Sequence, residues 1–363
     1  MDIHTYLAHQ KQRIADQSQQ VRDFAVFDFS HVPEQPVMRD ECCELIDAML
    51  RFDASGIPSH LAIVGARGSG KTLTLKYLQR LIPDQTALRV HYANCRHHNT
   101  SYRIFAHLLG GGGCAGASLS ELFQRFQARS GPKTVLVLDE VDLMSPKDKR
   151  REILYLLSRA EKPCMLVLLS NSPQLLKQLD AATRSSLQPM PMHFRNYDAE
   201  QIRRILEDRA RRGLHRWEDA ALRQIAALTV RLTNADARVA IKTLYYHVTR
   251  PDQGLSECFE SARRDIVVDM IHDLADHPLA ILWAAATSSS ELAKSIYERY
   301  TRFAVEQKEK PFSYVHFYAT LSYLQSMGLV ALISTKQGRT YTNRVMITFD
   351  AEVATSVAGL RFG

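Results

Sequence analysis

Residues 65–72 read GARGSGKT, the G-x-x-x-x-G-K-[ST] pattern of a loop that cradles phosphate groups. An apolar run, 61–64, precedes the motif, and residues 72–81 have the apolar spacing of a helix. In such a unit the glycines let consecutive N–H groups point at an anion, and the helix N-terminus adds a positive dipole. The alternative is a chance glycine-rich turn, which the flanking strand and helix disfavour. The motif predicts a nucleoside triphosphate site, with Lys71 at the β- and γ-phosphates and Thr72 at Mg²⁺.

The composition describes a globular protein with more than one domain. Its 363 residues exceed one ordinary core, and 45% hydrophobic with 23% charged residues is typical of globular chains. Without a long apolar run or a signal peptide, we expect a cytoplasmic, nucleoid-associated protein that makes no membrane contact. The six cysteines lack zinc spacing, which favours idle thiols. The net charge of +7 is compatible with nucleic-acid binding without requiring it.

The first half of the chain predicts a parallel sheet. Strand-like runs occupy residues 61–64, 87–93, 134–138 and 164–170, with helical patterns between them. This alternation predicts helical crossovers and a ligand site at the carboxyl ends of the strands. We therefore expect an α/β base domain over residues 1–192.

Helical patterns dominate the remainder of the chain. Amphipathic helices are predicted at residues 199–212, 218–229, 235–249 and 256–275. Three further patterns, 279–286, 291–307 and 314–327, precede β-rich runs at 329–334 and 345–349. The first set predicts an all-α lid over 193–275. Three helices followed by a hairpin predict a winged-helix domain over 276–363.

The hairpin and the helix before it are the candidate surface for duplex DNA. Residues 311–349 contain no Asp or Glu. The side chains expected to contact DNA from the hairpin are Lys336, Arg339, Tyr341 and Arg344, and those from the helix are Ser313, His316, Thr320 and Ser322. We expect phosphate contacts to dominate the affinity, because the helix is aromatic and poor in the Arg and Gln side chains that read bases. The alternative is a winged domain that only packs or binds protein.

Polar side chains follow two of the predicted strands. Asp139 and Glu140 end the run 134–138, and Asn171 follows the run 164–170. Beside a phosphate loop, Asp139 is expected to hold Mg²⁺ and Glu140 to polarise an attacking water. Asn171 is expected to reach the γ-phosphate or that water. The alternatives are ordinary loop starts at the carboxylates and turn chemistry at the asparagine.

Arg238 stands in the first turn of a predicted helix. A positive charge there opposes the helix dipole unless an anion compensates it. The position therefore hints that Arg238 reaches a phosphate group.

The ordered set of motifs resembles the AAA+ ATPases, and within them the origin recognition complex / cell division cycle six family of replication initiators. The resemblance rests on the phosphate loop, the Asp-Glu strand and segments 27–41, 92–102, 184–206 and 235–238. It covers the chain from about residue 26 to residue 349. It implies that the protein binds ATP or ADP with Mg²⁺ and hydrolyses ATP slowly as a switch.

The resemblance also implies roles for individual residues. Asn171 and Arg238 match the first and second sensors of the family, and with Glu140 they form the expected catalytic set. The nucleotide is expected to contact Val32, Pro33, Arg39, Gly68, Ser69, Gly70, Lys71, Thr72, Leu73 and Asp139. Thr72 and Asp139 would hold the metal. The implied partners are double-stranded origin DNA, the replicative helicase and other initiator subunits.

Two other functions fit parts of this pattern. One is an ATP-dependent DNA-targeting regulator of transposition, for which segment 32–41 and the C-terminal hairpin would be unexpected. The other is a nucleotide-switched scaffold whose winged helix binds protein only. Binding to duplex DNA separates the scaffold from the other two functions.

Overall fold

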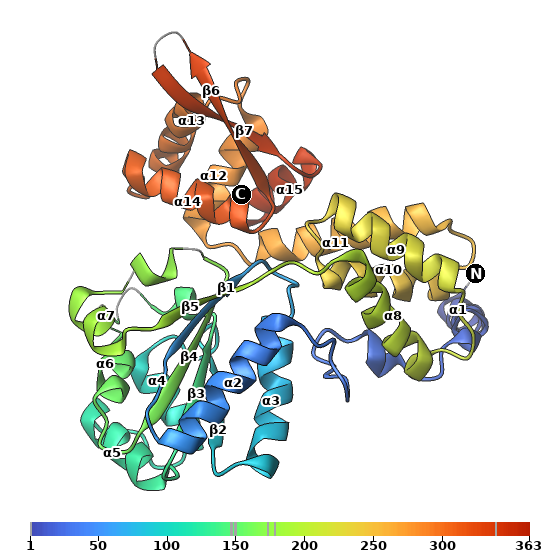
Figure 1. Ribbon diagram of the computed structural model, residues 1–363. Coiled ribbons are helices and arrows are strands. Elements are labelled where there is room, and N and C mark those ends of the chain that lie inside the picture. Colours follow the sequence, from blue (N-terminus) through green and yellow to red (C-terminus); the bar gives the residue numbers. More distant parts are fainter. Residues whose placement is uncertain (1, 146–147, 149–150, 173, 178, 338–339) are drawn as a thin grey trace. The chain divides into compact units, whose positions relative to one another are not determined.

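The computed structural model describes residues 2–145, 148, 151–172, 174–177, 179–337 and 340–363. The chain divides into two compact units (Figure 1). The base unit is Ser30–Asn196, and the helical unit combines Met1–Phe29 with Tyr197–Gly363. The first 29 residues thus group with the later helices. The division into domains 1–192, 193–275 and 276–363 stays a prediction. Among the described helices, none has both the length and the hydrophobicity needed to cross a bilayer.

The base unit is built on a five-stranded parallel sheet in the order β2-β3-β4-β1-β5. Its strands are β1 Leu61–Gly65, β2 Arg89–Asn94, β3 Thr134–Asp139, β4 Cys164–Ser170 and β5 Met190–Phe194. The four predicted strands are confirmed. The strand β5, which was not predicted, contains Pro191 and lies at the edge of the sheet. Proline is tolerated at an edge because its missing N–H costs no ladder hydrogen bond there.

Helices cover both faces of this sheet. They are α2 Asp40–Ser55, α3 Lys71–Gln85, α4 Ser101–Leu108, α5 Leu119–Arg129, α6 Glu152–Ser158 and α7 Ala181–Leu187, with the 3₁₀ turns η3 Val141–Leu143 and η4 Leu175–Lys177. Ile63 and Val137 pack with α2 and α3, whereas Ala62 and Leu138 pack with α4 to α7. The alternation follows from the two-residue period of a strand. It buries both faces and leaves the strand ends as the place for polar chemistry.

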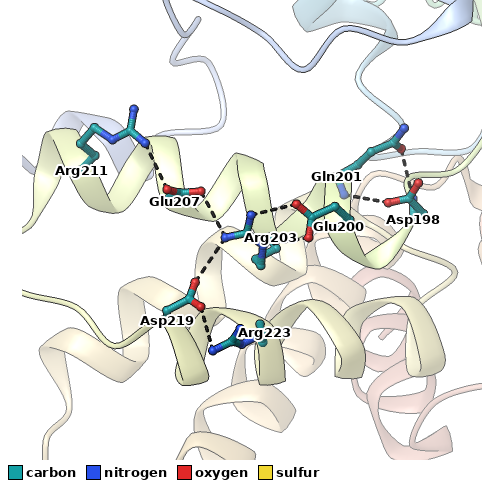
Figure 2. Close-up of polar contacts among 8 residues, drawn as sticks. All are labelled: Asp198, Glu200, Gln201, Arg203, Glu207, Arg211, Asp219 and Arg223. Atoms are coloured by element: carbon teal, nitrogen blue, oxygen red, sulfur yellow. Dashed lines mark hydrogen bonds and ion pairs between the residues drawn. The ribbon is translucent and has the colours of Figure 1, made fainter.

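The helical unit begins with α1 Ile3–Gln17, η1 Ser18–Gln20 and η2 Phe24–Phe27, and continues after the base unit with α8 Ala199–Gly213, α9 Asp219–Leu232, α10 Ala237–Thr249 and α11 Leu255–His272. Asp198 and Gln201 form a capping box at the start of α8. Figure 2 shows Arg203 of α8 paired with Glu207 on its own helix and with Asp219 of α9. These exposed pairs orient α8 against α9 more than they stabilise them.

Residues 21–28 are hydrogen-bonded to α8 and to the residue that follows it. Val21 and Leu214 form an isolated β-bridge, and the Arg22 guanidinium donates to the carbonyl of Arg211. The buried Arg209 guanidinium donates to the carbonyls of Val26 and Asp28. Burial lowers the pKa of Arg209 to about 10. The contacts are tight at Gly213, where a Cβ atom would stand 2.2 Å from Val26 Cγ2 and 2.9 Å from the Asp23 carbonyl oxygen.

Gly213→Ala is therefore expected to destabilise the protein by about 1–3 kcal/mol, because the added methyl group forces residues 23–26 away from α8. The thermal unfolding midpoint measures the effect, and limited proteolysis within residues 20–28 should speed up. Gly359→Ala is the matched control. A Cβ atom at Gly359 meets nothing within 4 Å, so this helical substitution should stabilise the protein by up to about 1 kcal/mol. Equal midpoints for the two variants would contradict the proposed packing at Gly213.

The C-terminal part contains α12 Asp276–Thr287, α13 Ala293–Glu306, α14 Tyr314–Ser326, β6 Val330–Gln337, β7 Thr340–Ile347 and α15 Ala351–Phe362. The antiparallel hairpin β6–β7 runs from the pair Val330 and Ile347 to the pair Gln337 and Thr340. Both strands extend further toward the tip than the sequence predicted. The helix α15, which begins after the N-cap Asp350, was not predicted either. Its buried residues share one core with α11, α12 and α14.

Candidate functional site

The phosphate loop leaves β1 with a backbone that requires glycine. Gly68 and Gly70 have φ values of 74° and 86°, a region that side chains disfavour. At Gly65 the constraint is space, since a Cβ atom would stand 2.5 Å from the Phe194 carbonyl oxygen of β5. Ser69 is buried, and its Oγ has no hydrogen-bond partner within the described part of the chain. An unsatisfied hydroxyl in a loop at the N-terminus of α3 fits a site that accepts an anion.

Lys71 is folded against the carbonyl groups of its own loop. Its side chain is buried, and Nζ donates to the carbonyl oxygens of Gly65 at 2.7 Å and Ala66 at 2.9 Å. Nζ also donates to Asn171 Oδ1 at 2.9 Å. Asn171 is near because β4 pairs directly with β1, so both strands end at the same place. The structure thus brings together two residues that are 100 positions apart.

Thr72 and Asp139 meet in the same region. Thr72 Oγ1 donates to Asp139 Oδ2 at 2.7 Å, and the Tyr92 hydroxyl donates to the same oxygen at 2.7 Å. Burial raises the pKa of Asp139, although both hydrogen bonds act in the opposite direction. A hydroxyl and a carboxylate at this distance are the hard oxygen donors that Mg²⁺ prefers. These two residues therefore fit a magnesium ion.

Glu140 has a different partner from its neighbour. Arg96 Nε donates to Glu140 Oε2 at 3.0 Å, and Arg96 Nη2 donates to Oε1 at 3.3 Å. Burial acts to raise the pKa of Glu140, but the hydrogen bond and charge of Arg96 bring the pKa below its ordinary value. A φ of 53° turns Glu140 away from the strand direction. Adjacent carboxyl groups thus have pKa values shifted in opposite directions, a pattern typical of sites that divide chemical roles.

Sequence reasoning assigned no role to Tyr92 or Arg96. Both belong to β2 or the turn after it, and β2 is the neighbour of β3 in the sheet, with Asn94 opposite Asp139. Their only signal in the sequence is a tyrosine and an arginine around the end of a predicted strand. Strand order was needed to bring them to the carboxylates.

Arg39 is hydrogen-bonded to the phosphate loop. It is 7% exposed, and its guanidinium donates to the carbonyl oxygens of Ser69 at 2.8 Å and Arg195 at 3.0 Å. The guanidinium carbon also lies 5.1 Å from the centre of the Phe194 ring. Val32 and Pro33 are half-buried in the preceding segment. Arg39 thus supports the loop directly, and an adenine pocket formed with Val32 and Pro33 stays a prediction.

Arg238 belongs to the helical unit and has an anion within its own helix start. The N-cap Asp236 accepts from Arg238 Nε at 3.0 Å and from Nη2 at 2.5 Å. Burial acts to lower the pKa of Arg238, but the charge and hydrogen bonds of Asp236 raise it. Asp236 therefore supplies the compensation that the helix dipole demands, and the dipole argument no longer requires a phosphate. A sensor role for Arg238 stays a prediction.

The predicted DNA contacts of the hairpin have different surroundings. Lys336 is exposed near the end of β6. Arg344 of β7 donates from Nε to Glu291 Oε2 at 2.8 Å, so its charge is already paired. Arg339 lies outside the described residues, and only the backbone of Tyr341 is described, within β7. The DNA-binding roles of these four residues stay predictions.

The helix α14 presents fewer polar contacts than the sequence predicted. Thr320 is 6% exposed and its hydroxyl donates to the His316 carbonyl, so its expected contact with DNA is wrong. The helical period turns this position toward the core beside Phe317 and Leu324. Ser313 is the N-cap of the helix, and its Oγ accepts from the backbone N–H of His316.

Comparison with known proteins adds the following similarities. A family model described as an AAA domain matches residues 57–179. ORC1-type DNA replication protein 1 of Archaeoglobus fulgidus is 25% identical, over 87% of this chain and 85% of its own length. ORC1-type DNA replication protein 3 of Sulfurisphaera tokodaii is 26% identical over 84% of each chain.

Solved structures agree on the fold. The Aeropyrum pernix ORC1 protein in complex with DNA has a TM-score of 0.66 at 23% identity, over 94% of this chain and 97% of that chain. The Aeropyrum pernix ORC2 protein, solved in ADPNP–ADP complexes, has a TM-score of 0.61 at 20% identity, over 94% and 99% of the two chains. At these identities the similarity establishes the fold alone.

Proposed function

Since this chain belongs to the ORC1/Cdc6-type family of AAA+ replication initiators, we propose that it binds ATP in the base unit and duplex origin DNA through its C-terminal winged helix. The observation that carries the nucleotide site is the convergence of Lys71, Thr72, Asp139 and Asn171 at the ends of three strands. The match to this chain extends over most of the length of both ORC1-type relatives. The A. pernix ORC2 protein, which has the same fold, was solved in ADPNP–ADP complexes.

We infer that phosphate oxygens take over hydrogen bonds that Lys71 now makes to protein carbonyl groups. Lys71 would exchange its bonds to the Gly65 and Ala66 carbonyls for phosphate oxygens, while the N–H groups of the loop and α3 receive the anion. The Ser69 hydroxyl would gain a partner. Thr72 and Asp139 would hold Mg²⁺, which neutralises charge on the phosphates.

Hydrolysis is the finer part of this proposal. Glu140 is the expected base for the attacking water, and its lowered pKa keeps it ionised at neutral pH. Arg96 would position the carboxylate and must leave part of it free to accept a proton. Asn171 Oδ1, already beside Lys71 Nζ, would orient the water or the γ-phosphate. Slow turnover suits a switch between ATP and ADP forms.

The DNA part of the proposal rests on the C-terminal helices and hairpin. A helix followed by a two-stranded wing is an arrangement that can place α14 in the major groove and the wing along the backbone. The stretch 311–349 has no acidic residue to repel phosphates. A. pernix ORC1, which has the same fold, was solved in complex with DNA. Contacts with a replicative helicase and other initiator subunits belong to the same proposal.

Footprinting on the DNA flanking the protein's own gene tests the proposal, with ATP and ADP compared. We expect protection of duplex DNA that depends on salt concentration and differs between the nucleotides. Failure to bind any duplex would contradict the initiator function and favour a scaffold whose winged helix binds protein. Protection only at transposon ends would instead favour a regulator of transposition.

Lys336→Ala should weaken duplex binding by about threefold to tenfold and lower the slope of log K against log salt by about one, since one phosphate contact is lost. Fluorescence anisotropy over a salt series measures both quantities. Lys177→Ala, which removes an exposed lysine of the base unit, is the charge-matched control and should leave the slope unchanged. If the two variants behave alike, the wing does not contact the phosphates.

A further inference from the structure

The outward face of α14 carries short side chains. Val315, Ala319, Ser322 and Ser326 follow one another at helical spacing, opposite the buried Phe317, Leu321 and Leu324. Val315 is 81% exposed, and Ala319 is exposed one turn later. A row of short side chains lets the helix backbone approach a surface closely. The two apolar residues of the row, Val315 and Ala319, would then contact that surface through their methyl groups.

This face offers few groups for hydrogen bonding to bases. The helix contains no Arg, Lys, Asp, Glu or Asn, and its one amide side chain is the exposed Gln325. The Ser322 hydroxyl donates to the Tyr318 carbonyl at 3.1 Å, and the Ser326 hydroxyl donates to the Tyr323 carbonyl at 2.7 Å. The His316 ring stacks on the Phe312 ring, with centroids 4.0 Å apart. Apart from Gln325, whose amide could pair with adenine, the side chains that make bidentate pairings with guanine and adenine are missing from this helix.

The charge around α14 favours a polyanion as the occupant of the face. Lys308 and Lys310 are exposed just before the helix, in a segment that also exposes Glu306 and Glu309, and Lys336 is exposed on the hairpin after the helix. No acidic residue occurs between positions 311 and 349. A protein partner with an apolar surface would not need this basic frame. A binding surface with anionic edges and methyl groups at its centre would match both the lysines around α14 and the apolar side chains of Val315 and Ala319.

We propose that α14 recognises thymine methyl groups in the major groove, through Val315 and Ala319. The proposal rests on the proposed DNA-binding function and adds its mode of base selection. Of the four bases, thymine alone presents a C5-methyl group in the major groove, and small apolar side chains are its usual contacts. The preferred site is accordingly a duplex with thymines at defined positions, and its specificity comes from apolar contact instead of hydrogen bonds.

Replacing thymine with deoxyuridine tests this inference, because uracil pairs like thymine but lacks the methyl group. The probe is a duplex that the full-length protein selects from a random pool with ATP and Mg²⁺, remade with uracil at one thymine at a time. We expect at least one position where uracil weakens binding by about fourfold, the value of one buried methyl group. Val315→Ala should weaken binding to the thymine duplex, and uracil should then cost less than it costs the unaltered protein.

Val305→Ala is the matched control, because Val305 is a 60% exposed valine at the end of α13. This variant should bind the thymine duplex like the unaltered protein and keep its full sensitivity to uracil. Uracil effects that persist undiminished in Val315→Ala would reflect DNA shape, and they would overturn the inference. Equal affinity for thymine and uracil at every position would also overturn it, while leaving DNA binding intact. Absence of binding to every duplex would overturn the proposed function as well.

Discussion

Lys71→Ala is expected to weaken ATP binding by at least about 100-fold, equivalent to about 3 kcal/mol. Lys71 Nζ is the only ammonium group that the described structure places among the Gly65, Ala66 and Asn171 oxygens. Alanine leaves the phosphate charges uncompensated within a buried loop, where electrostatic interactions are strong. Equilibrium binding of a fluorescent ATP analogue with Mg²⁺ measures the loss.

The control for this experiment is Lys310→Ala, which removes an exposed lysine before α14 and should leave ATP affinity unchanged. The thermal midpoint of Lys71→Ala must also be recorded, since the substitution removes the Nζ donor from the Gly65 and Ala66 carbonyl oxygens. A folded Lys71→Ala protein that binds ATP as the unaltered protein does would refute the assignment of the phosphate site.

Glu140→Gln should lower the rate of ATP hydrolysis by about 10²- to 10⁴-fold while ATP affinity changes little. An amide keeps the size of the side chain and a hydrogen bond to Arg96, but it cannot take a proton from water. Single-turnover hydrolysis of radiolabelled ATP measures the rate. Glu161→Gln, at an exposed glutamate before β4, should hydrolyse ATP at the normal rate. Undiminished hydrolysis by Glu140→Gln would assign the base to another residue.

The ion pair between Arg96 and Glu140 allows a second test of Glu140 as the base, through the pH dependence of hydrolysis. In the unaltered protein the pKa of Glu140 is lowered, so the acid limb of the hydrolysis profile should lie below the ordinary glutamate range. Arg96→Ala removes the hydrogen bond and charge but leaves the burial that raises the pKa. The acid limb should therefore move to higher pH. A limb that stays in place would mean that Glu140 is not the group that titrates.

Much of the base unit was predictable from local pattern. Buried strands appear as continuous apolar runs, and the glycines of the phosphate loop stand where φ is positive or where β5 comes close. The edge strand β5 escaped prediction because it alternates exposed and buried residues and contains proline. The helix α15 was not predicted because nothing in the sequence of the preceding hairpin indicates that another helix follows.

The residues around the carboxylates depended on the order of the strands. Asp139 and Glu140 were recognisable as acidic residues after a strand, but their partners were not. Tyr92 and Arg96 reach them because β2 lies beside β3, and Asn171 reaches Lys71 because β4 lies beside β1. Strand order is a long-range property, and no local spacing in the chain encodes it.

The sequence by itself determined which chemical groups the protein carries and in which kind of element each one stands: a lysine after a glycine loop, carboxylates after a strand, basic residues on a hairpin. The tertiary structure decided which of these groups are paired. In the folded chain Arg238 pairs with Asp236, Arg344 with Glu291 and Arg96 with Glu140. The physical reason is that charge and period are local quantities, whereas pairing and burial depend on elements that meet only when the chain folds.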